Sequence, residues 1–333
     1  MNPLVSILIP AYGAEEWIAD TIRSALGQTW PRKEIIIVDD GSTDQTLSIA
    51  RQFASKDVSV LSHANQGASA ARNKAYLVSQ GDYIQWLDAD DILAPDKIER
   101  QMHALSSCRS NRTLLSSAWG RFMYRSSKAQ FTVTPLWEEL APVEWLYRKM
   151  GQNLHMQPAT WLVSRQLSEA AGPWDQRLSL DDDGEYFCRV LLASDGVRFV
   201  PEARVYYRRS GLSSLSNVDR SDKKLESLCL SMKLHVAYLQ SLEDTERVRR
   251  ACQAYLQRSV IFFYPRRLDL VGQLQELASS LGGELAAPRL SWKYDWMRRT
   301  FGWNTARRAQ TCLPQLKWSV VRSWDKLLFR LER

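Results

Sequence analysis

Three aspartates lie within four residues of one another, at positions 88, 90 and 91, directly after the apolar segment Tyr83–Leu87. Carboxylates this close repel one another unless a cation compensates their charge. Oxygen ligands suit a hard ion such as Mg²⁺ or Mn²⁺, which proteins hold with one or two carboxylates and substrate phosphates. The simpler alternative is an acidic turn in which Asp91 caps the next helix. Because the segment follows a buried-strand pattern, we favour a site for a divalent cation and a diphosphate.

A second acidic segment, Asp39-Asp40-Gly41, follows the apolar residues 35–38. A turn that tolerates glycine lets a carboxylate approach a ligand closely, and such a group can accept a nucleobase imide N–H or a ribose hydroxyl. A helix cap explains Ser42 and Asp44 well but explains Asp39 poorly. Neither GxGxxG after the first strand nor GxxxxGK[ST] occurs, so dinucleotide-binding and P-loop folds are not favoured.

Alternating strand and helix patterns position these segments. Apolar runs predict buried parallel strands, and 3.6-residue periodicity predicts helices between them. The strands are predicted at Leu4–Pro10, Glu34–Asp40, Val58–Ser62 and Tyr83–Leu87, and the helices at Glu15–Leu26, Asp44–Ala54 and Ala68–Ser79. This order predicts an α/β fold with a mostly parallel sheet covered by helices on both faces. Ligands bind such sheets at the carboxyl ends of the strands, where these acidic segments and Pro10-Ala11-Tyr12 should meet.

The rest of the chain is less regular and then becomes helical. Strands are expected at Thr113–Ala118, Ala159–Ser164 and Val197–Arg208, and helices at Val143–Met150, Gly184–Ala193, Lys223–Gln240, Thr245–Phe262 and Leu268–Leu281. We therefore predict an α/β domain over residues 1–215, divided into halves 1–110 and 111–215. A C-terminal helical region follows over residues 216–333.

The three segments LVSILIPAYGAEEWIADTIRSALGQTWPRKEIIIVDDGSTDQT, NQGASAARN and GDYIQWLDADD occur in that order. Over residues 4–105 they resemble the nucleotide-binding half of the inverting family 2 glycosyltransferases, which have the GT-A fold. The resemblance implies that Pro10, Ala11 and Tyr12 line the nucleoside pocket and that Asp39 contacts the base. It also implies donor contacts by the side chains of Arg72, Asn73 and Asp88, with Asp90 and Asp88 binding Mn²⁺ or Mg²⁺.

The family also carries a Glu-Asp pair about six residues before a helical arginine, and the Asp of that pair is the catalytic base. If Arg189 matches that arginine, Asp182 replaces the Glu and Asp183 becomes the base. Three consecutive aspartates leave the register open by one residue, so Asp182 is the alternative base. An acidic helix start that complements the helix dipole is a compatible structural role. The acceptor pocket is expected near Trp174, Trp161 and His155.

The net positive charge of the chain comes from its tail. Residues 289–333 contain eleven Lys or Arg and three Asp or Glu, a net charge of +8, whereas all 333 residues together carry +7. Residues 1–288 therefore carry a net charge of −1. Apolar residues recur at helical spacing beside Trp318 and Trp324, namely Leu313, Leu316, Val320, Leu327 and Leu331. A basic amphipathic helix of this kind suits an anionic membrane surface, and packing on the rest of the protein is the alternative. Nucleic acid is not expected as a partner because the stretch lacks a recognised module.

These patterns together predict a metal-dependent, inverting glycosyltransferase of the hexosyltransferase type. It would move a sugar from a nucleotide-sugar, with a UDP-sugar favoured, to a hydroxyl of a glycan or lipid-linked acceptor in polysaccharide or glycoconjugate biosynthesis. No apolar run is long enough to span a membrane and the N-terminus lacks a signal-peptide pattern. We therefore expect a cytoplasmic protein that can attach peripherally to the inner face of the membrane. The alternative is an inactive nucleotide-sugar-binding module or a membrane-surface scaffold.

Overall fold

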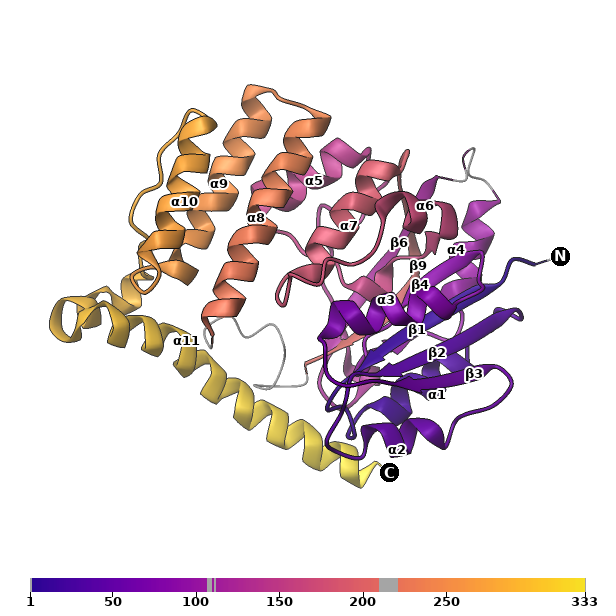
Figure 1. Ribbon diagram of the computed structural model, residues 1–333. Helices are drawn as coiled ribbons and strands as arrows, with labels where there is room; N and C mark the ends of the chain where they lie inside the picture. The colour runs from indigo at the N-terminus through magenta and orange to yellow at the C-terminus, as the bar shows by residue number, and fades with distance from the viewer. Residues whose placement is uncertain (1, 107–109, 111, 210–220, 333) are drawn as a thin grey trace.

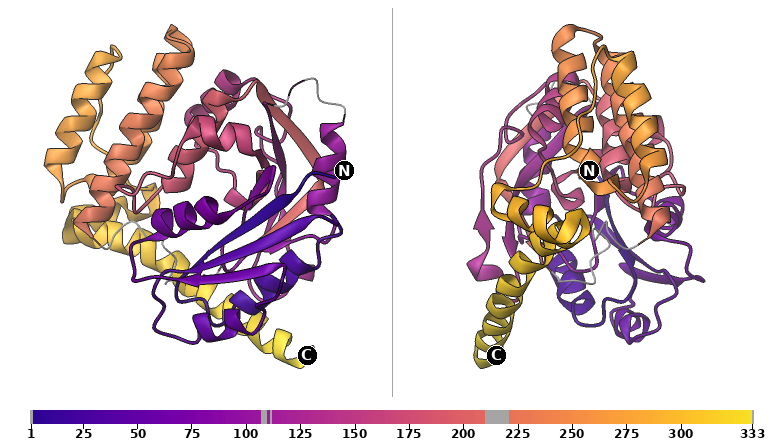
Figure 2. Two further views of the ribbon diagram at one scale, coloured as in Figure 1. Left: turned by 45° about the vertical axis from the view of Figure 1, so that its right-hand side comes forward. Right: turned by 90° about the vertical axis from the view of Figure 1, so that its left-hand side faces the viewer.

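The computed structural model describes residues 2–106, 110, 112–209 and 221–332. Its elements form two β-sheets with helices packed around them, and a group of C-terminal helices beside these sheets (Figure 1). A long last helix runs from that group back along the molecule, so that the C-terminus lies near the N-terminal half (Figures 1 and 2).

The first sheet has the order β3-β2-β1-β4-β8. The strands β1 (Val5–Ala11), β2 (Lys33–Asp39), β3 (Val58–Ser62) and β4 (Tyr83–Trp86) are parallel, whereas the short edge strand β8 (Val163–Ser164) is antiparallel to β4. Right-handed crossovers place α1 (Ile18–Leu26) and α2 (Thr46–Arg51) on one face and α3 (Ala68–Val78) on the other (Figure 1). The parallel α/β sheet predicted from the sequence is therefore confirmed.

A second sheet, with the order β5-β9-β6-β7, stands against the first and was not predicted. The long strands β6 (Thr113–Phe122) and β9 (Gly196–Arg208) are parallel, with a register shift after Ser117. The short strands β5 (Ile92–Leu93) and β7 (Gln130–Phe131) pair antiparallel with β9 and β6. Because β5 pairs with β9 only a few residues after β4 ends, the segment between β4 and β5 joins the two sheets.

Helices surround the second sheet and form the C-terminal region. The remaining helices are α4 (Lys97–Leu105), α5 (Pro142–Gln152), α6 (Arg165–Ala171), α7 (Asp182–Ala193), α8 (Asp222–Leu242), α9 (Glu246–Phe263), α10 (Leu268–Ser280) and α11 (Trp292–Leu331). Single 3-10 turns occur at Ser126–Lys128 and Pro158–Thr160. Helices α8, α9 and α10 pack on one another and against α5 and α7 (Figure 1). Gly302, with φ 79° and ψ 169°, interrupts α11.

Two predictions about elements need comment. The predicted strand Ala159–Ser164 is wrong over its first part, because Pro158–Thr160 forms a 3-10 turn and only Val163–Ser164 pair as a strand. The predicted boundary near residue 215 lies in residues 210–220, outside the described part of the chain. The tail is helical as predicted, although the side chains of residues 311–320, including Leu313, Leu316, Trp318 and Val320, lie outside the described ones.

Candidate active site

The carboxyl ends of β1, β2 and β3 lie level at one edge of the first sheet. Ala11 is paired with Asp39, and Asp39 is paired with Ser62. The backbone N–H of Asp40 donates to the Ala11 carbonyl oxygen at 2.8 Å, which extends this pairing one residue past the strands. This register confirms the sequence prediction for the ends of the first two strands, and β4 runs parallel to β1 with Trp86 paired to Leu8.

Asp39 presents a buried carboxylate oxygen that has no partner within the described structure. The side chain belongs to a residue that is only 1% exposed. Its Oδ2 accepts from the Ser42 N–H and from the Ser62 hydroxyl, each at 3.2 Å, but its Oδ1 accepts no hydrogen bond. A buried acceptor without a donor is costly. A ligand that offers an N–H or O–H group would satisfy this atom.

The neighbouring Asp40 has a structural role instead. Its two oxygens accept from the backbone N–H groups of Gln66 and Gly67, at 2.8 and 2.9 Å, and so hold the start of α3. Gly41 makes the turn possible, because its φ is +71° and a Cβ there would lie 2.7 Å from the Asn65 nitrogen. The two adjacent aspartates thus differ sharply in how well their oxygens are satisfied.

The first strand ends in the three residues that the resemblance assigns to the nucleoside pocket. Pro10 and Ala11 are buried at the end of β1, whereas Tyr12 is 55% exposed just beyond it. The loop after Tyr12 is fastened to the turn after β2, since the Gly13 N–H donates to the Ser42 hydroxyl at 3.2 Å. The exposed Tyr12 ring therefore lies on the loop next to the Asp39 turn.

The segment with Asp88, Asp90 and Asp91 occupies the junction between the two sheets. Asp91 is fully buried, and its Oδ1 accepts from the Arg208 N–H on β9 at 2.9 Å, while its Oδ2 has no partner among the described residues. Burial raises the pKa of Asp91 well above its ordinary value, and the charges of Asp90 and Asp88 raise it further. The Arg208 guanidinium donates to the Asp90 carbonyl oxygen at 2.8 Å. The segment is thus anchored but remains rich in negative charge.

Arg72 connects this segment to the start of α7. From α3, its NH2 donates to Asp88 Oδ1 at 2.8 Å and its NH1 donates to Asp182 Oδ2 at 2.6 Å. The Ser69 hydroxyl also donates to Asp182 Oδ2, at 3.2 Å. Although burial alone lowers the pKa of Arg72, the charges of Asp182 and Asp88 outweigh it and raise the pKa above its usual range. Two residues distant in sequence are therefore brought to one guanidinium.

Asp183 follows Asp182 in the first turn of α7 and differs from it electrostatically. Burial and the neighbouring charges of Asp182 and Asp181 together raise the pKa of Asp183 to about 7. Asp181, in contrast, accepts from the Ser231 hydroxyl at 2.9 Å and is held against α8. A carboxylate with a pKa near neutrality can exchange a proton with a substrate at physiological pH.

Asn73 and Trp174 form a reciprocal contact. The Asn73 amide donates to the Trp174 carbonyl oxygen at 2.9 Å and accepts from the Trp174 N–H at 2.8 Å. The Trp174 indole stacks on Tyr186 with ring centroids 4.1 Å apart, and Arg72 lies over the indole at 4.4 Å from its centroid. Asn73, predicted as a donor contact, thus fixes the loop before α7 to α3.

The three residues expected near the acceptor lie in different surroundings. Trp161 and Trp174 are 1% and 2% exposed, and Trp161 stacks on Phe187 of α7 with ring centroids 5.4 Å apart. His155 is exposed and meets the edge of Trp119 with ring centroids 6.0 Å apart. The two tryptophans support α7 from within the core, whereas His155 faces solvent.

Sequence reasoning did not single out Tyr207, which lies on β9 beside the acidic residues. Burial raises the pKa of Tyr207, as do the charges of Asp91, Asp90, Asp88 and, more weakly, Asp183. Its ring meets Trp119 edge-on with centroids 5.9 Å apart. A tyrosine in a strand rich in Val and Tyr carries no distinctive sequence signal. Tyr207 lies near the Asp88–Asp91 segment and Asp183 because of the way the second sheet packs against the first.

The acidic residues fit a metal site that a substrate completes. Among the described residues, no three His, Cys, Asp or Glu side chains are arranged as a full set of metal ligands. Mg²⁺ commonly takes only one or two protein carboxylates and fills its other positions with phosphate oxygens and water. Besides burial, the charges of Asp90 and Asp88 raise the pKa of Asp91, so the three carboxyl groups repel one another. Asp88 and Asp90 are therefore suitable ligands for a cation that arrives with a diphosphate.

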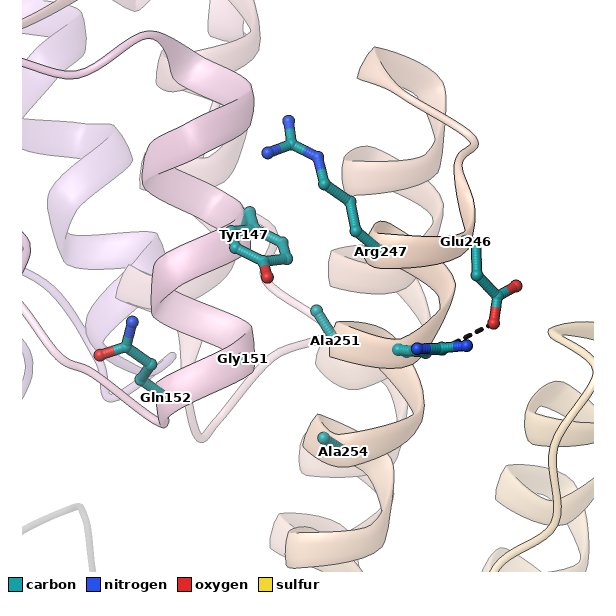
Figure 3. Close-up of a pocket in the computed structure, with 8 residues that line it drawn as sticks. Tyr147, Gly151, Gln152, Glu246, Arg247, Ala251 and Ala254 are labelled. Atoms are coloured by element: carbon teal, nitrogen blue, oxygen red, sulfur yellow. Dashed lines mark hydrogen bonds and ion pairs between the residues drawn. The ribbon is translucent and has the colours of Figure 1, made fainter.

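A surface hollow of about 540 Å³ lies elsewhere, between α5 and α9 (Figure 3). Tyr147, Gly151 and Ala251 line it, together with Arg247, which pairs with Glu243 at 2.7 Å. None of the predicted site residues lines this hollow. In the described part of the chain, no helix combines the length and the apolar character needed to cross a bilayer.

Comparison with known proteins finds similarity to one family of glycosyltransferases. Residues 6–140 match the sequence profile of glycosyl transferase family 2. An uncharacterized glycosyltransferase of Haemophilus influenzae is 43% identical over 104 residues, which cover 30% of this chain and 42% of that protein. The glycosyltransferase GlyG of Streptococcus pneumoniae is 29% identical over 234 residues, which cover 66% of this chain and 76% of GlyG. The matches thus span from about two fifths to three quarters of these relatives' own lengths.

A solved structure supports the fold. The crystal structure of residues 1–349 of S. aureus TarS in complex with UDP-GlcNAc superposes with a TM-score of 0.67 at 18% sequence identity. The superposition covers 84% of this chain and 83% of that one. At this level of identity the likeness concerns the fold, which is the GT-A fold expected from the sequence. Together, these comparisons relate residues 6–140 to glycosyl transferase family 2 by sequence, and 84% of the chain to the fold of TarS.

Proposed function

We propose that the protein is an inverting glycosyltransferase that moves a sugar from a nucleotide-sugar to an acceptor hydroxyl. The observation that carries this proposal is the bridge made by Arg72 between Asp88 and Asp182. Asp88 belongs to the predicted donor side, and Asp182 precedes a carboxylate whose pKa is raised to about 7. A donor bound at the first sheet would therefore lie beside a general base on α7.

The donor is proposed to be a UDP-sugar. The unpartnered Oδ1 of Asp39 can accept the imide N–H of uracil, and the exposed ring of Tyr12 lies on the adjoining loop. The structure of TarS in complex with UDP-GlcNAc supports this choice, because TarS shares the fold of this chain. Pro10 and Ala11 would form the floor of the nucleoside pocket at the end of β1.

The diphosphate is proposed to bind with Mn²⁺ or Mg²⁺ at Asp90, with Asp88 as the second carboxylate. A divalent ion bound there would supply Lewis-acid stabilisation of the charge that develops on the departing diphosphate. Arg72 is a positioning residue in this scheme: it holds Asp88 on the donor side and Asp182 on α7 in one network.

Asp183 is proposed to act as the general base. The acceptor oxygen forms a bond to the anomeric carbon while the bond from that carbon to the diphosphate oxygen breaks, and the hydroxyl proton passes to Asp183. A single displacement from the face opposite the leaving group inverts the configuration. Asp182 is the less suitable base because Arg72 and Ser69 already donate to it.

The acceptor is proposed to be a hydroxyl of a glycan or of a lipid-linked glycan, in the synthesis of polysaccharides or glycoconjugates. His155 is the exposed member of the three residues expected there, and Trp161 and Trp174 would act by holding α7 in place. We place the enzyme in the cytoplasm, with access to the inner face of the membrane.

Calorimetric titration with UDP, in the presence and absence of MnCl₂, tests the donor site. We expect binding that strengthens with Mn²⁺ and loses this dependence in Asp90→Ala. The matched control is Asp57→Ala, which removes an exposed carboxylate between α2 and β3. Equal, metal-independent binding by all three proteins would contradict the metal assignment. Donor binding without any sugar transfer or donor hydrolysis would instead indicate an inactive nucleotide-sugar-binding module.

A further inference from the structure

The last helix, α11, has an inner face that is fixed to the α/β domain. Asp325 accepts from the backbone N–H of Tyr124 at 2.9 Å and from the Arg125 guanidinium at 2.7 Å. At the next position, the Lys326 ammonium donates to Glu16 at 2.7 Å, and its nitrogen lies 5.2 Å from the centroid of the Tyr124 ring. The end of α11 is therefore held in a defined orientation on the domain.

The opposite side of the same segment is apolar and exposed. Trp324, Leu327 and Leu331 recur at positions i, i+3 and i+7 and so lie on one side of the helix. They are 62%, 48% and 75% exposed. We refer to these three residues as the outer face of α11. An amphipathic helix that packs only on its own protein would turn such residues inward, so intramolecular packing explains the inner face alone.

The first part of α11 repeats this combination of exposed aromatic and basic groups. Trp292, Trp296 and Phe301 are 80%, 59% and 59% exposed, and Lys293, Arg298 and Arg299 beside them are also exposed. The Lys293 nitrogen lies 5.8 Å from the centroid of the Trp292 ring. Exposed tryptophans next to lysines and arginines are typical of proteins that enter the interface between lipid headgroups and acyl chains.

The charge of the tail favours an anionic lipid surface over a second copy of this chain as the partner of this surface. Residues 289–333 carry a net charge of +8, whereas residues 1–288 carry −1. A second copy of this chain would bring the same positive tail to the contact, which is unfavourable for self-association through α11. An anionic lipid surface offers both the negative charge and the apolar layer that the two clusters need.

We propose that α11 docks on an anionic lipid bilayer through its outer face and through Trp292, Trp296 and Phe301. The chain would lie on the membrane without crossing it, and the inner-face contacts of Asp325 and Lys326 would set the orientation of the α/β domain on the surface.

This docking would bring the donor side of the site close to the bilayer. The ring centroids of Tyr124 and Trp17 are 5.2 Å apart, and Arg208 lies over the Trp17 ring at 4.3 Å from its centroid. Arg208 in turn donates to the Asp90 carbonyl oxygen. Three side chains, those of Tyr124, Trp17 and Arg208, thus connect α11 to the acidic segment. Insofar as the proposed sugar transfer holds, this position favours an acceptor hydroxyl on a lipid-linked glycan.

Vesicle flotation with the full-length protein tests the docking. We would use vesicles of phosphatidylcholine alone and vesicles with 30% phosphatidylglycerol, at low and high salt. We expect the wild-type protein to float with the anionic vesicles at low salt and to bind the neutral ones at least about tenfold more weakly. Trp324→Glu/Leu327→Glu should lower anionic-vesicle binding about tenfold or more. The matched control, Leu77→Glu/Val133→Glu, changes two exposed apolar residues outside α11 and should bind like the wild type.

Three further measurements separate the possible outcomes. Circular dichroism verifies that the variants fold. If the wild-type protein floats with the anionic vesicles but does not bind UDP, the proposed function is overturned and the docking stands. Sedimentation velocity tests self-association: a dimer that Trp324→Glu/Leu327→Glu converts to a monomer would overturn the proposal in favour of a contact between copies. Flotation that is unchanged in that variant, or absent in the wild type, would also overturn it.

Discussion

Arg72 and Asp182 form an ion pair at 2.6 Å that joins α3 to the first turn of α7. This pair distinguishes between two adjacent carboxylates. Asp182 is compensated by a guanidinium, whereas burial and the charge of Asp182 itself raise the pKa of Asp183. In the sequence, three consecutive aspartates left open which of them is the base. The ion pair at Asp182 and the raised pKa of Asp183 favour Asp183 as the proposed base.

The first prediction concerns Asp183→Asn. The amide cannot take a proton from the acceptor, so we expect the turnover number for sugar transfer to fall by about 10²–10⁴-fold. UDP binding should change less than about twofold, because Asp183 lies on α7 and not at the ends of β1 and β2. Transfer assays and calorimetry on the same preparation measure both quantities. Normal transfer by this variant would show that Asp183 is not the base.

The second prediction concerns the pH dependence of transfer. A general base acts in its ionised form, so activity should rise with pH around 7 and level off above it, following the raised pKa of Asp183. Asp182→Asn removes a neighbouring negative charge, which should lower that pKa and move the rise in kcat/KM to lower pH. Profiles of both proteins from pH 5 to 9 measure the shift. A rise at the same pH in the two proteins would refute the coupling.

The third prediction concerns stability, for which the same pKa has the opposite consequence. A folded-state pKa near 7, above the unfolded value of about 3.9, means that wild-type stability falls as pH rises between these values. Asp183→Asn is neutral at every pH and should therefore be more stable than the wild type. The difference should grow from about pH 4 to pH 7, then level off at roughly 1–4 kcal/mol. Urea unfolding in EDTA, without donor, measures it; a constant difference across this range would argue against the raised pKa.

Much of the donor half could be predicted from the sequence because its signals are local. Apolar runs that end at Asp39 and near Asp88 define strands, and parallel strands with helical crossovers must present their carboxyl ends at one edge. The structure brings Asp39 level with Ala11 and Ser62 by this rule. The family motifs added roles for residues that already stood at that edge.

The acceptor half depends on long-range pairing that no local pattern encodes. Strand β5 has only two residues, and it exists because it pairs with β9, more than a hundred positions later. The same pairing brings Tyr207 beside the acidic segment. Asn73 has ordinary polar character in the sequence, and only the folded chain shows that its amide is committed to the Trp174 backbone.

The fourth prediction contrasts Asp39→Asn with Asp40→Asn. Changing Asp39 alters the buried oxygen that is proposed to bind the base, so UDP binding should weaken about tenfold or more while thermal stability changes little. Changing Asp40 weakens acceptors for the Gln66 and Gly67 N–H groups, which should lower stability by about 1–3 kcal/mol. Calorimetry and thermal unfolding of both variants measure these effects. Equal losses of UDP affinity would show that Asp39 has no special contact with the nucleoside.

The fifth prediction concerns the attachment of α11. Asp325→Ala removes the acceptor for two backbone N–H groups, of Tyr124 and Arg125, and the partner of the Arg125 guanidinium. We expect amide hydrogen exchange of residues 321–332 to accelerate about tenfold or more, because local opening loses about 1–3 kcal/mol of stabilisation. The matched control is Glu332→Ala, which removes only a pair with the same Arg125 from a side chain that is 55% exposed. That surface pair should contribute less than about 1 kcal/mol, so the control should exchange nearly as slowly as the wild type. Equal acceleration in both variants would mean that Asp325 does not fix the helix.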